Sequence, residues 1–431
     1  MRRNVLIPCT VLLLAWLAAP SAQRGPAGPV TAIVGARLVD GTGTPPVSDS
    51  VILVSGDRIT AAGPRARVQV PAGATVVNAS GKTVIPGLVD VHCHLNQPAD
   101  VMRKLLPVAL NWGVTTIRMT GNDKPEIMHV YEAAKAGAFP APRVYTAGQG
   151  FNLTGPYPGA PTLKPTTPEE ARKGVQAHKA LKVDFIKLWM SEKGFTPDVV
   201  EAIVDEAKKQ SIPIVAHIGN AAQVKQLAEL GVTDFMHEAR DGMNPEFIAY
   251  AKSKGLSFAP TLGQGQSRWY YYEHPEILSM DPKFDGFYTR GRAMLNDAAR
   301  RQEITGAPDF AAQKQRFKDN NYPFIKMMSD AGIRIVTGTD CGAEASQTTP
   351  VGHTTHTEVH MFVEAGMTPI AALRAATLDA ARVLERTENP SYGSVQAGKI
   401  ADLVVLNADP VADINNTIKI DRVMRAGRWV Q

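Results

Sequence analysis

Short apolar segments alternate with longer amphipathic segments through the middle of this chain, and this alternation restricts the folds that it can adopt. Eight apolar segments have the length of buried strands. They are Leu88–Val91, Val114–Arg118, Arg143–Thr146, Asp184–Leu188, Ile214–Ala216, Asp234–Met236, Ser257–Ala259 and Ile333–Thr337. Helical patterns lie between several of them, at Glu169–Leu181, Pro197–Lys209 and Ala221–Leu230. Eight strands that alternate with helices over about 250 residues predict an α/β fold, the (β/α)8 TIM barrel.

Strand-rich segments occupy both ends of the chain, outside the predicted barrel. Ala32–Val34 and Val51–Val54 lie near the amino terminus, and Ala401–Leu406 and Arg422–Arg428 lie near the carboxyl terminus. Because chain termini often lie close together, we expect the two pieces to form one small, discontinuous β-sandwich domain. The predicted division gives this domain residues 23–86 and 391–431, and gives the barrel residues 87–390.

The first 22 residues are predicted to be a secretory signal peptide. Arg2 and Arg3 precede an apolar stretch, Val5–Ala19, and small residues follow up to Ala22. A membrane anchor fits less well, because the stretch is short and is interrupted by Pro8. We therefore expect a secreted or periplasmic protein without a stable membrane anchor after cleavage.

Charge gives no indication of a nucleic-acid partner. Cleavage would remove two arginines and no acidic residue, which lowers the formal net charge from +5 to +3. The sequence has no basic run and no clustered stripe of Lys and Arg. We expect a small-molecule substrate.

Side chains that can bind metal stand at the carboxyl ends of five of the predicted strands. They are His92, His94, Lys187, His217, His237 and Asp340. On a strand, residues i and i+2 point to the same face, so His92 and His94 reach toward one point. The carboxyl ends of barrel strands face one pocket, and imidazole is the commonest transition-metal ligand. The sequence therefore predicts a metal site.

Lys187 indicates that this site holds two metal ions. A protonated lysine repels a cation, but a desolvated lysine with a lowered pKa can react with carbon dioxide to form an anionic carbamate. That group can bridge two ions about 3.5–4 Å apart. The predicted first ion binds His92, His94 and Asp340, and the predicted second ion binds His217 and His237. The alternative is a lysine paired with a nearby acid.

Hydrolysis of an amide or peptide bond is the reaction that such a pair of ions would support. Bound water has its pKa lowered toward about 7, so that hydroxide is available to attack a polarised carbonyl. Asp340 is the predicted catalytic residue: it would take up the proton as a general base and deliver it to the leaving amine as a general acid.

Together these segments resemble the amidohydrolase superfamily, and within it the imidazolonepropionase-like and prolidase-like binuclear hydrolases. The matching motifs are Ile85-Pro86-Gly87-Leu88-Val89-Asp90-Val91-His92-Cys93-His94, Val183-Asp184-Phe185-Ile186-Lys187-Leu188, Val215-Ala216-His217, Phe235-Met236-His237-Glu238, Thr337-Gly338-Thr339-Asp340 and Gly393-Ser394-Val395-Gln396-Ala397-Gly398-Lys399-Ile400-Ala401-Asp402-Leu403. The resemblance implies the barrel, the small β domain and divalent metal, most often zinc. It also implies hydrolysis of dipeptides or N-acyl amino acids.

Three further residues are candidates for binding substrate. Tyr157 follows the third strand and could polarise the carbonyl, or it could only pack within its loop. Arg240 could bind a substrate carboxylate, or it could pair with Glu238. His353 follows the last strand and could lie at the rim of the pocket.

Two other features leave alternatives open. An insertion at about residues 263–322 is predicted to be a helical lid; the alternative is a contact between copies in a homo-oligomer. Cys93 and Cys341 both neighbour metal ligands, and we expect two separate buried thiols. A disulfide between them requires Cα atoms within about 7 Å.

The alternative prediction for the same barrel is a mononuclear enzyme, either a deaminase or a hydrolase of cyclic amides or lactones. These enzymes dispense with the lysine of the fourth strand. Deaminases also need a glutamate near the fifth-strand histidine, where this chain has Ile218-Gly219-Asn220.

Overall fold

A computed structural model describes residues 29–152, 161–190, 194–266, 269–279, 293, 296–342 and 349–430. All eight predicted strands are present, and each starts and ends within a few residues of the prediction. They are β6 (Leu88–His94), β7 (Val114–Met119), β8 (Arg143–Thr146), β9 (Ile186–Trp189), β10 (Ile214–His217), β11 (Asp234–Met236), β12 (Ser257–Ala259) and β13 (Arg334–Ile335). A two-residue strand, β14 (Cys341–Gly342), follows them.

The eight strands and β14 form two parallel sheets. One has the order β14-β6-β7-β8 and the other has the order β13-β12-β11-β10-β9. Backbone hydrogen bonds join the sheets on both sides, from the Asp184 N–H to the Thr146 carbonyl (2.8 Å) and from the Val91 N–H to the Thr337 carbonyl (3.0 Å). This arrangement brings the carboxyl ends of the strands toward one end of the molecule.

Helices lie between the strands, as the amphipathic segments predict. They are α1 (Ala99–Asn111), η1 (Pro125–Ile127), α2 (Met128–Lys135), α3 (Pro168–Ala180), α4 (Pro197–Lys209), α5 (Ala221–Glu229), η2 (Arg240–Gly242), α6 (Pro245–Ser253), α12 (His353–Glu364), α13 (Pro369–Ala375) and α14 (Leu378–Glu385). The sequence suggests one continuous helix from Ile370 to Glu385, but the structure has two. The break lies at Thr377, which leaves the helical conformation while its hydroxyl donates to the Leu373 carbonyl (2.7 Å).

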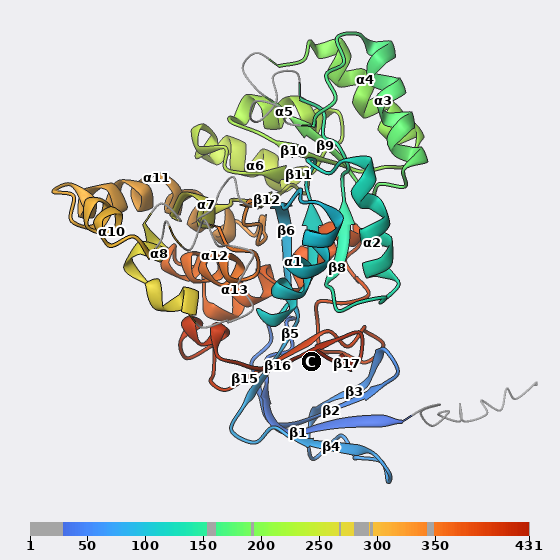
Figure 1. Ribbon diagram of the computed structural model, residues 1–431, viewed down its shortest axis with the longest axis vertical. Helices are drawn as coiled ribbons and strands as arrows, with labels where there is room; N and C mark the ends of the chain where they lie inside the picture. Colours follow the sequence, from blue (N-terminus) through green and yellow to red (C-terminus); the bar gives the residue numbers. More distant parts are fainter. Residues whose placement is uncertain are drawn as a thin grey trace, which may run out of the picture.

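A separate mixed sheet combines strands from both ends of the chain. Its strands are β1 (Val30–Leu38), β2 (Val47–Ser55), β3 (Arg58–Pro64), β4 (Thr75–Asn78), β5 (Thr83–Pro86), β15 (Leu403–Leu406), β16 (Ile420–Arg425) and β17 (Arg428–Trp429), with a short helix η6 (Ile414–Ile418) before β16. β15 pairs antiparallel with β5, which joins the two ends. The sheet lies at one end of the molecule, at the bottom of Figure 1. That it is an independent sandwich domain stays a prediction.

The insertion after β12 is helical where the structure describes it. Its elements are α7 (Leu262–Gln266), α8 (Tyr270–Glu273), η3 (Pro275–Ser279), α10 (Ala298–Thr305) and α11 (Phe310–Asp330), and α10 and α11 extend outward in Figure 1. Three of its described aromatic residues, Trp269, Tyr271 and Tyr272, are buried within the chain, where Trp269 packs on Phe317. These rings are therefore not an exposed surface for a second copy.

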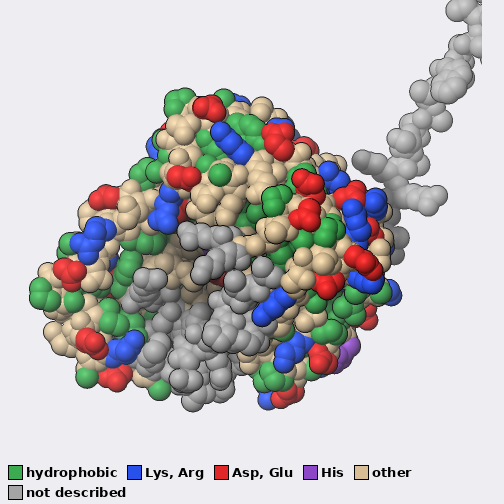
Figure 2. All heavy atoms as spheres, turned by 90° about the horizontal axis from the view of Figure 1, so that it is seen from above, with side chains coloured by type: hydrophobic (Ala, Val, Ile, Leu, Met, Phe, Trp, Pro, Cys, Tyr) green, Lys and Arg blue, Asp and Glu red, His purple; other side chains and the backbone are tan. Residues whose placement is uncertain are grey.

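The surface charges are mixed, and the described helices are not of the membrane-spanning kind. Figure 2 shows Lys and Arg side chains interspersed with Asp and Glu over the face seen from above. Among the described residues, no helix is both long and apolar enough to cross a membrane. The predicted signal peptide lies outside the described residues.

Candidate metal centre

Five of the six predicted ligands contact one another at the carboxyl ends of the strands. His92 Nε2 lies 2.9 Å from His94 Nε2, and Asp340 Oδ1 lies 3.5 and 3.2 Å from these two nitrogens. The rings of His217 and His237 are 4.3 Å apart, and those of His92 and His237 are 5.3 Å apart. Ligand atoms of His92, His237 and Asp340 all lie within 4.8 Å of one another.

The environment gives these ligands the protonation states that metal binding needs. Burial, together with neighbouring positive groups, lowers the pKa of His92 well below its usual value and that of His217 to about 2. Burial also lowers the pKa of His237 to about 4. Burial alone would raise the pKa of Asp340, but the His94 hydrogen bond and nearby positive charge hold it below its usual range. At neutral pH these three imidazoles are neutral and the carboxylate is ionised.

Lys187, the sixth predicted ligand, is fully buried beside this group. Its Nζ has no hydrogen-bond partner among the described residues and lies 5.0 Å from the centre of the Trp189 ring. Burial lowers the pKa of Lys187 to about 7; Arg118 adds to this, and Asp340 opposes it. A lysine in this state is neutral in part at neutral pH and can act as a nucleophile.

Two ligands are held in a backbone conformation that residues other than glycine rarely adopt. The φ angles of His237 and Asp340 are +73° and +53°. Such residues persist only where the surrounding structure fixes them, and they concentrate at functional sites. Here the Thr261 hydroxyl lies 2.7 Å from His237 Nδ1, which leaves Nε2 of that ring for a metal. The Thr120 hydroxyl lies 3.2 Å from His94 Nε2. We did not predict either threonine, because each follows the end of a strand other than that of its histidine: Thr120 follows β7 and Thr261 follows β12.

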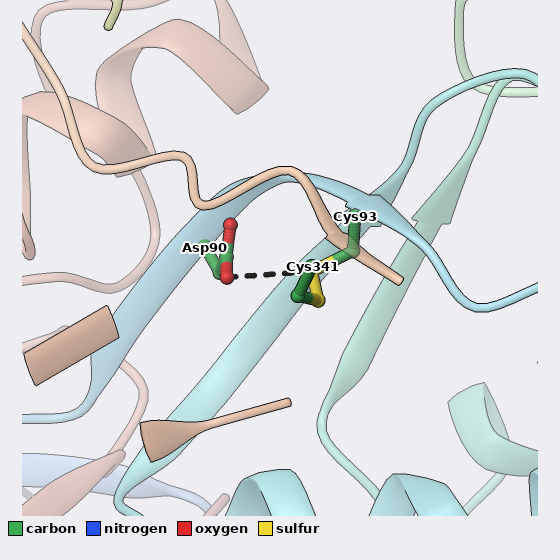
Figure 3. A group of neighbouring side chains, drawn as sticks. All are labelled: Asp90, Cys93 and Cys341. Atoms are coloured by element: carbon green, nitrogen blue, oxygen red, sulfur yellow. Dashed lines mark hydrogen bonds between the residues drawn. A yellow bond between two sulfur atoms is a disulfide. The ribbon is translucent and has the colours of Figure 1, made fainter. Parts of the chain in front are cut away.

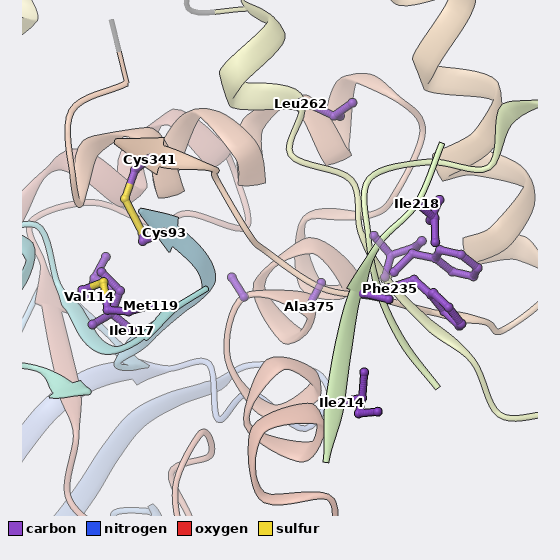
Figure 4. Packing of buried hydrophobic residues seen from close by; sticks show 14 of the residues in the cluster. Cys93, Val114, Ile117, Met119, Ile214, Ile218, Phe235, Leu262, Cys341 and Ala375 are labelled. Carbon is purple, nitrogen blue, oxygen red and sulfur yellow. A yellow bond between two sulfur atoms is a disulfide. The ribbon is translucent and has the colours of Figure 1, made fainter. Parts of the chain in front are cut away.

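The expectation of two separate thiols is wrong, since Cys93 and Cys341 form a disulfide. The parallel register of β6 and β14 sets the two residues directly opposite each other, with Cα atoms 4.7 Å apart. Both side chains point away from the ligands into the core between strands and helices. Figure 4 shows them there, beside Val114, Ile117 and Met119 of β7.

Asp90 of β6 bonds to the segment just before β14 and to α12, and it is a residue that sequence reasoning missed. Its carboxylate accepts hydrogen bonds from the Thr339 N–H (3.1 Å) and hydroxyl (2.7 Å), and from the Thr355 hydroxyl (3.3 Å). Figure 3 shows it beside the disulfide, where Oδ2 lies 3.3 Å from Cys93 Sγ. The signal for it was an acidic side chain inside an otherwise apolar strand.

The three predicted substrate residues lie in different places. Tyr157 lies outside the described residues. Arg240 lies in η2, half exposed, with its guanidinium 3.8 Å from Glu238 and 3.4 Å from Asn321 Oδ1. His353 is buried at the start of α12, against the ring of Trp112 and 3.0 Å from the Tyr271 hydroxyl.

The donor set fits a divalent transition metal. Neutral imidazoles and one carboxylate are the ligands that zinc and similar ions take in proteins. The close approach of two imidazole nitrogens and a carboxylate oxygen in a buried site is what a shared cation would stabilise. Lys187 has no hydrogen-bond partner among the described residues, and its amine would supply one more ligand only after conversion to an anion.

The chain is similar to known proteins in sequence and in fold. The chain is 24% identical over 406 residues to a 5-methylthioadenosine/S-adenosylhomocysteine deaminase of Symbiobacterium thermophilum, which covers 88% of this chain and 85% of that protein. Among solved structures, a provisionally assigned prolidase from Bifidobacterium longum superposes with a TM-score of 0.74 at 26% identity, covering 93% of this chain and 94% of the other. A Xaa-Pro dipeptidase with bound methionine gives a TM-score of 0.72 at 22% identity, covering 93% and 100%.

A family model covers most of the chain as well. The model of the amidohydrolase family matches residues 83–430, which include every ligand described above and the carboxyl-terminal strands of the mixed sheet. This protein belongs to the amidohydrolase family.

Proposed function

We propose that this protein is a binuclear metal-dependent hydrolase of amide bonds in small molecules, with the two parallel sheets closed into one (β/α)8 barrel. The observation that carries the proposal is Lys187: a fully buried lysine without a hydrogen-bond partner among the described residues, beside four histidines and an aspartate. A carbamate on this lysine would remove the unpaired amine and add the negative charge that two cations need.

The proposed ligands divide between the two ions along the chain. His92, His94 and Asp340 would hold one ion, and His217 and His237 would hold the other, with a carbamate on Lys187 as a ligand shared by both. Bound zinc would supply an activated water and polarise the substrate carbonyl.

Asp340 is the residue that we assign to proton transfer. Its carboxylate is ionised, and it is held by His94 at 3.2 Å and by its own backbone N–H, which donates to the His92 carbonyl (2.7 Å). A carboxylate fixed in this way can accept a proton from the attacking water and pass it to the leaving amine.

A cavity beside Arg240 indicates which amides would fit. It has a volume of about 630 Å³, and its lining includes Trp269, Phe310, Phe317 and Asn321 in addition to Arg240. Arg240 is three residues from His237, so their Cα atoms are at most about 11 Å apart. We propose a dipeptide or an N-acyl amino acid whose carboxylate pairs with Arg240 and whose apolar side chain contacts the aromatic rings.

The protein would act outside the cytoplasm. Residues 1–22 would direct export and be removed, which leaves a secreted or periplasmic enzyme that needs neither a membrane nor nucleic acid.

A deaminase is the competing function, because the chain is similar to a named deaminase over most of its length. Against it stand the buried Lys187 and the absence of an acidic residue in the Ile218–Asn220 segment after His217. Zinc content separates the two functions: we expect two zinc ions per chain, whereas one ion with unmodified Lys187 would favour the deaminase.

The test of the reaction is product analysis. Zinc-loaded protein is incubated with a panel of dipeptides and N-acyl amino acids, and products are identified by mass spectrometry beside an Asp340→Asn variant. Cleavage that Asp340→Asn abolishes supports the proposal. Release of ammonia from aminopurine nucleosides without amide cleavage would overturn it.

A further inference from the structure

The Cys93–Cys341 disulfide lies between the ligands of the first proposed ion. Cys93 separates His92 from His94, and Cys341 directly follows Asp340. The bond therefore connects the two backbone segments that supply all three ligands. The two cysteines are 248 residues apart in the chain.

Hydrogen bonds also tie the segment around Asp340 to β6, the strand that carries the two histidines. β14 has only two residues, so its ladder with β6 is short. Before it, the Asp340 N–H donates to the His92 carbonyl and Thr339 donates twice to the Asp90 carboxylate, and the disulfide adds a covalent link to these hydrogen bonds. Asp340 also has a φ of +53°, a conformation that a non-glycine residue keeps only under constraint. A covalent bond at the next residue is a constraint of that kind.

Opening the bond would move these segments apart. Two thiol sulfurs are non-bonded neighbours, which lie about 3.5–4 Å apart, whereas bonded sulfurs lie about 2 Å apart. Both sulfurs are fully buried among packed side chains, so the displacement would be taken up by the strands that carry them. Metal ligands tolerate little displacement, because bond lengths to zinc are fixed within about 0.2 Å.

We propose that Cys93 and Cys341 are positioning residues, and that their disulfide holds His92, His94 and Asp340 at the spacing needed to retain the metal. This inference rests on the proposed metal site. Reduction adds two electrons and two protons to the sulfurs; a water-soluble trialkylphosphine supplies the electrons and becomes the phosphine oxide with an oxygen from water. Metal retention then depends on the redox state of the surroundings, and an oxidising compartment outside the cytoplasm favours the closed form.

The test compares zinc retention with stability in four full-length proteins. These are the wild type, the Cys93→Ser/Cys341→Ser variant, the Cys93→Ala/Cys341→Ala variant and a Val51→Ala control. Val51 is fully buried in β2 of the mixed sheet, so its truncation destabilises the protein away from the ligands. Each protein is loaded with zinc and titrated with a competing chelator, and its thermal midpoint is measured in the metal-free form.

If the disulfide positions the ligands, the double variants should lose more zinc affinity than a general loss of folding stability would cause. Both double variants are expected to bind zinc at least about tenfold more weakly, the size of effect seen when groups that orient metal ligands are removed. Val51→Ala is expected to keep wild-type zinc affinity at a lowered midpoint. Double variants that keep wild-type affinity, or a control that loses as much, would overturn the inference.

A second measurement applies if the double variants do not fold. Zinc-loaded wild type is treated with the phosphine, and free thiols and released zinc are followed together. Release of zinc in step with two newly formed thiols per chain supports the inference, and new thiols without zinc release overturn it. Wild type that binds no zinc would overturn both this inference and the proposed function, whereas disulfide-dependent zinc binding without amide cleavage would overturn the function alone.

Discussion

Lys187 is the residue on which the proposed chemistry depends most. Lys187→Ala removes the buried amine, and with it the proposed bridge between the two ions. We expect zinc content to fall from two ions to one per chain and kcat/KM to fall about 100-fold or more. Addition of formate or acetate should restore part of the activity, because a small carboxylate can occupy the space of the carbamate. The exposed Lys182 provides the control, and Lys182→Ala should change neither quantity. Full activity in Lys187→Ala would refute the binuclear site.

A variant of Arg240 tests whether this residue binds the carboxylate of the substrate. Arg240→Met keeps most of the length of the side chain and removes the charge. KM for a substrate with a free carboxylate is expected to rise about 10- to 100-fold, the loss that follows from one charge-assisted hydrogen-bonded pair. The same substrate with its carboxylate capped as an amide should show a much smaller change. Equal losses for both substrates would mean that Arg240 supports the fold of η2 and does not bind the carboxylate.

At the scale of elements, Glu358 connects the insertion to the helix that follows the last strand. Its carboxylate on α12 accepts the backbone N–H groups of Leu262 and Gly263 at the start of α7 (3.0 and 2.6 Å). Burial raises the pKa of Glu358 to about 8, and these two hydrogen bonds oppose the rise. The folded protein therefore holds a proton that the unfolded chain releases near its ordinary pKa.

The sign of the resulting pH dependence follows from linkage. A raised folded-state pKa gives a contribution that is complete below about pH 4.5 and is lost as the pH rises through about 8. Stability of the metal-free protein should therefore fall across this window, and Glu358→Gln, which keeps an acceptor oxygen but does not titrate, should make the fall smaller. Urea unfolding at several pH values measures it. An unchanged slope in the variant would show that other groups set the pH dependence.

The elements that the sequence predicted well are those with a local signal. Each ligand strand is a short apolar run that ends in a polar side chain, so its position and the direction of its ligand depend only on neighbouring residues. The disulfide was not predicted, because it depends on the register between β6 and β14, two strands far apart in the chain. The split between α13 and α14 was missed for a related reason: Thr377 bonds back to the Leu373 carbonyl, which periodicity does not reveal.

At the scale of the whole molecule, long-range pairing decides how the parts fit together. The sheet that joins β5 to β15 could be anticipated, since both ends of the chain have strand character and lack partners elsewhere. The pairing of Arg118 with Asp234 could not be anticipated. Both are charged residues within apolar strands, and the two strands belong to different sheets. The structure buries Arg118 fully between the sheets.

The Arg118–Asp234 pair leads to a prediction about how the two parallel sheets hold together. Arg118 Nη1 lies 2.5 Å from Asp234 Oδ2, its Nε donates to the Val91 carbonyl (2.7 Å), and its guanidinium stacks 4.7 Å from the Phe185 ring centre. Arg118→Met leaves Asp234 as a buried charge without its partner, which should lower the free energy of unfolding by about 3–5 kcal/mol. Arg118→Met/Asp234→Leu removes both charges and should recover most of that loss, because apolar side chains can replace a buried ion pair. Urea unfolding of the metal-free proteins measures both effects. If the double variant is no more stable than Arg118→Met, the pair contributes through its hydrogen bond to β6 rather than through charge.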